Sequence, residues 1–177
     1  ERVARAEIGR RAGVRVAVQF PGHRLASPIA SAHRRLLSAA KPAMTHTIEG
    51  PFHVQMTPEP LAHADAPPQL GRFRLDKRYE GLLDAVGRGE MLSARTFVEG
   101  SAGYVAIERV VGMLEGRLRS FVLQHSGVME RGMKRLFLEV VPDSGTGQLV
   151  GLSGRMGIDI AGGDHFYRFE YTLPGAE

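Results

Sequence analysis

The sequence predicts an all-β protein in which residues 44–177 form an eight-stranded antiparallel closed barrel. Three observations lead to this prediction: apolar and polar residues alternate with a period of two, strand-like runs recur at even spacing, and glycine-containing turns separate them. No apolar stripe with the 3.6-residue period of a helix follows residue 44. Closure into a barrel is expected because it removes the exposed strand edges that promote aggregation.

The expected strands follow one another along the chain. The first alternates around residues 52–57 and ends at a proline-rich loop, and the second lies at residues 72–79, where Lys77 is the exception on the apolar side. Six further runs follow at residues 82–95, 103–114, 117–126, 134–141, 148–160 and 164–173. Glycine-rich segments such as 99–103 and 143–147 are typical of hairpin turns between antiparallel strands.

The composition excludes several classes of protein. The 177 residues are 43% hydrophobic and 24% charged, which is ordinary for a globular domain with a buried core. No apolar run is long enough to cross a bilayer and no signal peptide is recognisable, so a cytoplasmic protein without a membrane partner is expected. The absence of Cys excludes disulfides, thiolate zinc sites and thiol catalysis.

Residues 1–43 are predicted to be a poorly structured basic leader. The leader holds 9 basic and 2 acidic residues, a net charge of +7, whereas residues 44–177 hold 14 basic and 17 acidic residues, a net charge of −3. The barrel domain therefore lacks the positive field that nucleic-acid binding needs. The leader is interpreted as an organelle-type presequence, as upstream sequence translated ahead of a true start at Met44, or as a disordered tail.

The strand at residues 103–114 has apolar residues on both of its faces. Val105 and Ile107 alternate with Ala106 and Val110, so both faces of this strand favour burial. A single barrel buries only the inner face of each strand. The second apolar face therefore implies either a covering element or a subunit interface, and we predict a homo-oligomer.

Polar residues placed among these apolar ones are the candidates for chemistry. Glu108 shares a face with Ala106 and Val110, where desolvation raises the pKa of a carboxylate and suits it to proton transfer. The alternative is an ion pair with an arginine of a neighbouring strand: Arg95, Arg117 or Arg119. Glu90 is a second catalytic candidate if it points into the same lumen.

Ligand-binding candidates come from three strands. Gln124 and His125 lie on opposite faces of one strand, so only one of them can face the lumen. His125 is interpreted as a general base or ligand donor, or alternatively as a core histidine whose hydrogen bonds are satisfied. One face of the last strand carries four ring side chains: His165, Tyr167, Phe169 and Tyr171. They predict an aromatic wall for an apolar ligand or, alternatively, ordinary barrel packing. Tyr104 could add a hydroxyl to such a pocket.

No metal and no cofactor are expected. The 7 His residues are scattered and form no ligand spacing with acidic residues. The glycines of residues 145–151 have the wrong spacing for a dinucleotide-binding loop, and no nucleophile elbow is present.

Several runs of the sequence together resemble one family. They are LDK (75–77), RGEMLSA (88–94), GSAGYVA (100–106), SFVLQHSG (120–127), VVPDSGTG (140–147) and FEYTL (169–173). In this order they resemble the bacterial family catalogued as domain of unknown function 3224. The resemblance implies an allene oxide cyclase-like barrel, related in shape to lipocalins. It implies no activity, because that of the family is unassigned, and no catalytic residue is transferred.

Three functions remain from the sequence alone. The first is binding of a small apolar or amphipathic ligand in the barrel lumen. The second is a cofactor-independent isomerase or cyclase that uses a lumen carboxylate, by analogy of fold. The third is a structural homo-oligomer whose barrel is filled by side chains. A hollow in the lumen distinguishes the first two functions from the third.

Overall fold

The computed structural model describes residues 44–63 and 69–174. The predicted leader, residues 1–43, lies outside these ranges. Within them, no helix combines the length and the hydropathy that crossing a membrane requires.

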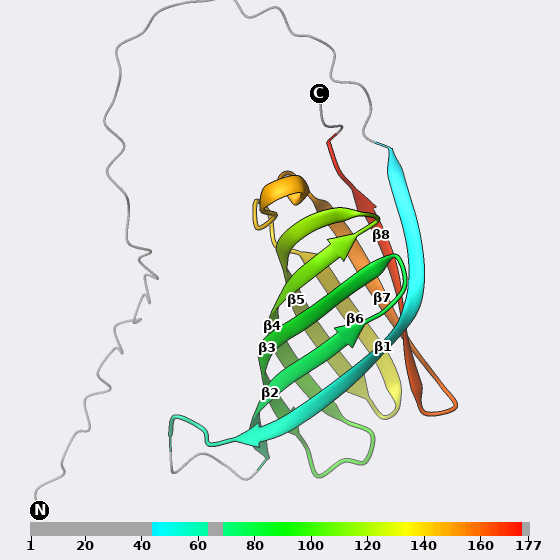
Figure 1. The fold of residues 1–177 in the computed structure, drawn as a ribbon. Coiled ribbons are helices and arrows are strands. Elements are labelled where there is room, and N and C mark those ends of the chain that lie inside the picture. The colour runs from blue at the N-terminus through cyan, green and yellow to red at the C-terminus, as the bar shows by residue number, and fades with distance from the viewer. Residues whose placement is uncertain (1–43, 64–68, 175–177) are drawn as a thin grey trace, which may run out of the picture. The chain divides into compact units, whose positions relative to one another are not determined.

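The described chain folds into a closed barrel of eight antiparallel strands in sequential order, as the sequence predicts (Figure 1). Each strand pairs with its neighbours in the chain, and β1 closes the barrel against β8. The strands are β1 (Thr45–Glu59), β2 (Leu70–Tyr79), β3 (Leu83–Arg95), β4 (Ala102–Leu114), β5 (Arg117–Glu130), β6 (Met133–Val140), β7 (Ser153–Ala161) and β8 (Asp164–Thr172).

The strands differ from the predicted runs mainly at their ends. β1 is longer than expected because its first half pairs with β8 and its second half with β2, and the exchange of partners occurs at Phe52. Strand β7 starts later than predicted. The residues before it form a 3-10 helix, η1 (Gly147–Leu149), whose Leu149 is buried, so this segment covers one end of the barrel.

The turns that join the later strands are as tight as their glycines suggest. Glu115 and Gly116 connect β4 to β5 with φ values of 46° and 82°, and Arg131 and Gly132 connect β5 to β6 with φ values of 47° and 91°. Two consecutive left-handed residues are typical of the type I′ hairpin, whose twist matches that of the strands. These turns set the pairing register of β4, β5 and β6.

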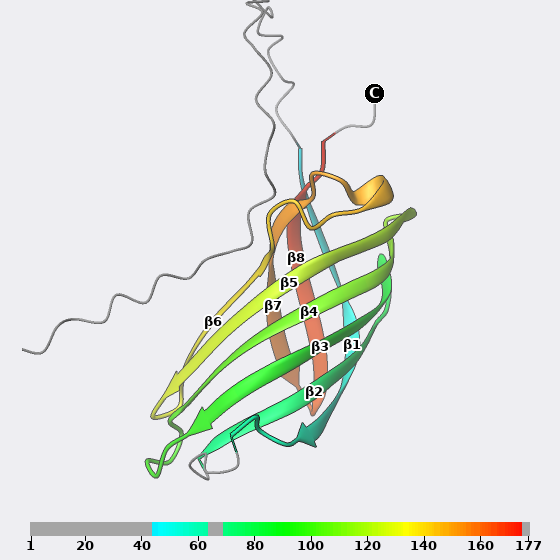
Figure 2. The same ribbon diagram turned by 90° about the vertical axis from the view of Figure 1, so that its left-hand side faces the viewer.

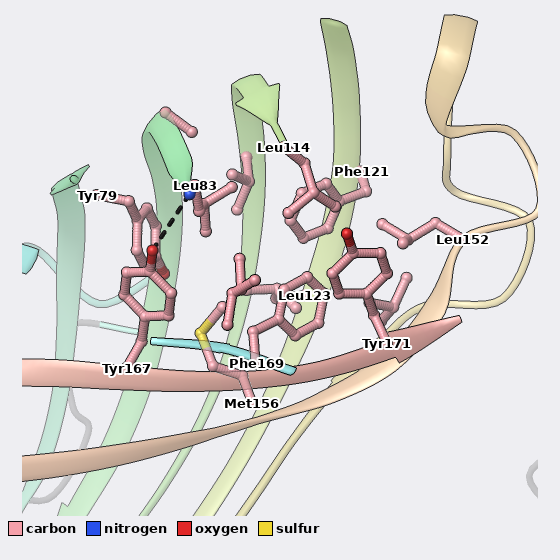
Figure 3. Close-up of a cluster of buried hydrophobic side chains, with 14 of the residues drawn as sticks. Tyr79, Leu83, Leu114, Phe121, Leu123, Leu152, Met156, Tyr167, Phe169 and Tyr171 are labelled. Carbon is pink, nitrogen blue, oxygen red and sulfur yellow. Dashed lines mark hydrogen bonds between the residues drawn. The ribbon is translucent and has the colours of Figure 1, made fainter. Parts of the chain in front are cut away.

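The end of the barrel that η1 covers, which we call the plugged end, is filled by side chains (Figure 3). Phe169 stacks against Phe121 with ring centroids 5.8 Å apart and against Tyr171 with centroids 5.1 Å apart. Leu149 and Leu152 pack onto the same cluster from the η1 segment. The opposite end, where the turns 96–101, 131–132 and 162–163 lie, we call the open end (Figure 2).

The contact between β6 and β7 is the weakest in the barrel wall. Only Glu139 and Arg155 are in register between these two strands, whereas β4 and β5 are paired over their whole length. The sheet is therefore least continuous between β6 and β7.

Candidate functional site

Glu108 lies in the middle of β4 and points into the lumen, as its alternation with apolar residues predicts. Its side chain is completely buried. Within the described ranges it is the only acidic residue at a strand position that faces the lumen. Such a charge is stable inside a protein only when it is paired and hydrogen-bonded.

Two residues of β2 bind the carboxylate of Glu108. Lys77 Nζ donates a hydrogen bond to Oε2 at 2.6 Å, and the Tyr79 hydroxyl donates to Oε1 at 2.8 Å. Lys77 Nζ also lies 3.3 Å from the Tyr79 hydroxyl oxygen, so the three groups form a closed network. The expected ion pair of Glu108 therefore exists, but the prediction that Arg95, Arg117 or Arg119 is the partner is wrong.

Glycine on β3 makes this contact sterically accessible. β3 lies between β2 and β4, and Gly87 is directly opposite Lys77 on one side and Val110 on the other. A Cβ at Gly87 would overlap the Glu108 carboxylate and contact the Tyr79 ring. The missing side chain lets groups of β2 and β4 meet across the strand between them.

His125 of β5 is the fourth member of this buried group. Its Nε2 lies 3.0 Å from Glu108 Oε2, and its side chain is almost completely buried. The N–H direction is poorly aligned with the carboxylate, so Nε2 has no hydrogen-bond partner among the described residues. Burial lowers the pKa of His125 and the nearby Lys77 charge adds to this, which outweighs the opposing effect of Glu108. The imidazole is therefore neutral at pH 7.

The pKa of Glu108 is lowered, contrary to the prediction that burial raises it. Burial does act in the expected direction, but the nearby imidazole of His125 and the charge and hydrogen bond of Lys77 stabilise the carboxylate more strongly. Burial, together with the charge and hydrogen bond of the same carboxylate, raises the pKa of Tyr79 well above its usual value. At neutral pH Glu108 is thus ionised and forms the ion pair with Lys77, while Tyr79 and His125 are neutral.

The open end of the barrel contains a cavity of ≈ 740 Å³, which is within the range of about 300–1,000 Å³ that is typical of small-molecule sites. Its inner wall is predominantly apolar and includes Phe73, Met91, Leu136 and Ile158. Tyr104 also lines it, and the pKa of its hydroxyl is raised by burial and by the charge of Glu108. Tyr104 is thus one of the polar groups of the cavity wall, with Ser93 and Lys134 among the others.

Two of the predicted site residues lie outside the lumen. Glu90 points outward from β3, and its carboxylate receives hydrogen bonds of 2.8 Å and 3.0 Å from the exposed Arg72 guanidinium. Gln124 is exposed on the outer face of β5 because His125 takes the inner position. The prediction that Glu90 shares the lumen with Glu108 is therefore wrong, and Gln124 cannot contact a ligand there.

The aromatic residues of β8 lie in the packed half of the barrel. Tyr167, Phe169 and Tyr171 belong to the hydrophobic core and do not line the cavity of the open end. The Tyr167 hydroxyl donates to the Glu80 carbonyl oxygen at 2.9 Å and accepts from the Leu83 N–H at 3.2 Å. Their placement agrees with barrel packing rather than with a ligand wall.

His165 lies apart from these three residues. It lines a separate pocket of ≈ 440 Å³ near the start of β8, where β1 exchanges pairing partners. Its ring is 5.3 Å from that of Phe52, between centroids. It therefore does not belong to the same site as Tyr104 or His125.

Sequence reasoning missed three residues of the network: Lys77, Tyr79 and Gly87. Lys77 was visible as a charge on the apolar side of its strand, which indicates an acidic partner inside the barrel. No feature of the sequence identified Glu108 as that partner, because β3 separates the two strands. Within the described chain, no group of three or more His, Asp or Glu residues is arranged to hold a metal ion.

Comparisons with known proteins agree with this architecture. The family described as "Protein of unknown function (DUF3224)" matches residues 48–171, and no curated protein matches the chain. A crystal structure of a protein with unknown function from the DUF3224 family of Shewanella oneidensis MR-1 is similar, with 53% sequence identity and a TM-score of 0.71. The similarity covers 75% of this chain and 100% of that chain. Since the family match extends over nearly the whole barrel, from β1 to β8, this chain belongs to the DUF3224 family.

Proposed function

We propose that this protein binds a small apolar or amphipathic ligand in the cavity at the open end of the barrel. The observation that carries the proposal is the uneven filling of the lumen. The plugged end is packed with aromatic and aliphatic side chains, whereas the open end holds a cavity of ≈ 740 Å³ with a largely apolar wall. Pockets of this size and lining are typical of small-molecule sites.

The contrast between the two ends also bears on the alternative functions. A barrel that serves only as a structural unit has no need of a hollow, because apolar space without contents forgoes packing energy. An isomerase or cyclase would need a carboxylate that meets its substrate. Glu108 is completely buried, is held by Lys77 and Tyr79, and does not line the cavity. Ligand binding therefore has the stronger support.

A neutral apolar dye tests the proposal without involving charge. N-phenyl-1-naphthylamine fluoresces when it enters an apolar site. We expect saturable binding to the wild-type protein. Ser93→Trp places a large ring in the cavity and should abolish the binding. The matched control Gln124→Trp adds the same ring to the outer face and should leave it unchanged.

Absence of saturable dye binding to the wild-type protein would contradict the proposal. Equal loss of binding in both Trp variants would also contradict it, provided that circular dichroism shows both to be folded. Binding that survives Ser93→Trp would place the dye site elsewhere.

We also propose that the outer face of β3–β6 forms a homo-oligomer interface. The register brings Leu92, Val105 and Phe137 into one row across these strands, and Ile107 lies beside them. Their exposed fractions are 52%, 54%, 71% and 53%. Large apolar side chains gathered on one outer face favour association, and a second copy of this chain would bury them symmetrically.

A further inference from the structure

The mouth of the cavity carries two cationic side chains at the same level of the barrel. Arg95 is opposite Ala102, Ala102 is opposite Met129, and Met129 is opposite Lys134, so the four residues form one row across β3, β4, β5 and β6. All four line the cavity. Neighbouring strands are about 4.8 Å apart, which separates Arg95 from Lys134 by about 14 Å along the wall.

Both cations occupy positions of their strands that face the lumen. Arg95 continues the inward series that includes Met91 and Ser93, and Lys134 begins the series that continues with Leu136. Among the described residues, no carboxylate oxygen lies within 4.0 Å of either side chain. Arginines on the outer surface are different, because many of them lie within 4.0 Å of a carboxylate: Arg72, Arg74, Arg78, Arg88, Arg135, Arg155 and Arg168.

The charge inside the barrel is therefore unbalanced. Glu108 is the only acidic residue at an inward strand position of the described chain, and Lys77 already neutralises it. Arg95 and Lys134 have no acidic partner among the described residues; Arg135 and Asp159 also line the cavity, so the four charged residues of its lining carry a net charge of +2. Below them the wall is apolar, with Phe73, Met91 and Ile158.

This order of surfaces matches an amphiphile with a negative end. An apolar body would enter the deeper part of the cavity, where it replaces water on apolar side chains. An anionic group would remain at the mouth, where it accepts charge-assisted hydrogen bonds from the guanidinium and the ammonium groups. A cationic head group would meet like charges there.

We propose that the ligand is a small organic anion with an apolar body, such as a carboxylate, held head-outward by Arg95 and Lys134. This inference rests on the proposed ligand-binding function and adds the charge and the orientation of the ligand. It also makes binding dependent on ionic strength, because salt screens attraction between partly exposed charges.

Three probes with the same hydrocarbon chain test the charge preference. Decanoate, 1-decanol and decylammonium are titrated against the wild-type protein at pH 8, below their micellar concentrations, by displacement of N-phenyl-1-naphthylamine. We expect the affinity to decrease from decanoate to decanol to decylammonium, and the preference for decanoate over decanol to decrease as salt is added. Displacement by decanol reports on the apolar cavity alone.

A pair of charge-matched double variants tests the two residues. Arg95→Gln/Lys134→Gln should weaken decanoate binding about ten-fold or more and leave decanol binding within about two-fold, since only decanoate accepts charge-assisted hydrogen bonds from the two side chains. Arg88→Gln/Arg155→Gln removes the same net charge from two outward side chains that are 80% and 85% exposed, and should change neither affinity.

The outcomes separate this inference from the proposed function. If decanol or decylammonium binds as tightly as decanoate, or if both double variants weaken decanoate binding equally, the anion preference is overturned while ligand binding in the cavity remains. If neither the dye nor any of the three probes binds, the proposed function fails and the inference fails with it.

Discussion

Lys77 of β2 and Glu108 of β4 form an ion pair of 2.6 Å inside the barrel, although β3 lies between their strands. The exposed fractions of their side chains are 5% and 0%. Gly87 on β3 leaves the space through which the carboxylate is reached. The pair thus links β2 and β4 across the strand that separates them.

Removing one member of this pair should destabilise the barrel strongly. Glu108→Gln leaves the Lys77 ammonium buried without a counter-charge, and we expect a loss of about 3–5 kcal/mol in the free energy of unfolding by urea. The double variant Lys77→Met/Glu108→Leu should lose less than Glu108→Gln alone, since it buries no charge. The control Glu90→Gln breaks an exposed ion pair and should cost about 1 kcal/mol or less. Equal losses of unfolding free energy in the Glu108→Gln and Glu90→Gln variants would contradict the conclusion that Lys77 and Glu108 form a buried ion pair.

Stability should fall in two stages as the pH is lowered. Burial lowers the pKa of His125 below its ordinary value of 6.5, so the unfolded chain takes up a proton first and stability falls below pH 6.5. The pKa of Glu108 is lowered from 4.5 because its partners outweigh burial, so a second loss begins as the pH approaches 4.5. Urea unfolding at a series of pH values measures both losses of stability.

The variant His125→Gln isolates the first stage. We expect it to flatten the dependence of unfolding free energy on pH just below 6.5, whereas the exposed control His53→Gln should retain that dependence. A pH profile that is the same in wild type and His125→Gln would show that this imidazole does not titrate as its burial requires.

The substitution Gly87→Ala should destabilise the protein, although alanine favours strands more than glycine does. The added Cβ at Gly87 overlaps a carboxylate that Lys77 and Tyr79 hold in place by hydrogen bonds, so we expect thermal unfolding at a clearly lower temperature. At Gly157 the nearest atom to an added Cβ is the Arg168 carbonyl oxygen at 3.9 Å, so Gly157→Ala should be neutral or slightly stabilising. Equal effects of the two substitutions would contradict the steric role of Gly87.

The proposed homo-oligomer interface should be sensitive to charge at its centre. Ile107→Lys introduces a charge that association would have to bury, so size-exclusion chromatography with light scattering should report a smaller mass than for the wild type. Gln55→Lys, on the exposed outer side of β1, should not change the mass. A wild-type protein that is monomeric at high micromolar concentration would end this proposal.

The period-two alternation was sufficient to predict which face of most strands points inward. Glu108 and Tyr104 lie on the face that this pattern predicts, because side chains of a strand alternate between its two sides. For Gln124 and His125 the pattern predicted only that one of them faces inward, and the structure shows that it is His125. Glu90 was placed wrongly because the glycines around it carry no side chain that would mark the inner face of β3. The segment before β7 was misjudged because Leu149 and Leu152 are buried in η1 and its following turn rather than in a strand.

The sequence by itself determined the all-β class, the number of strands and the presence of a charged group in the lumen, since these depend on alternation and on turns between residues close in the chain. Only the tertiary structure decided that Lys77 neutralises Glu108, that the aromatic residues of β8 fill one end, and that Arg95 and Lys134 share one level at the other. The physical reason is that barrel closure and strand register bring together residues from separate strands, and alternation along one strand contains no information about its neighbours.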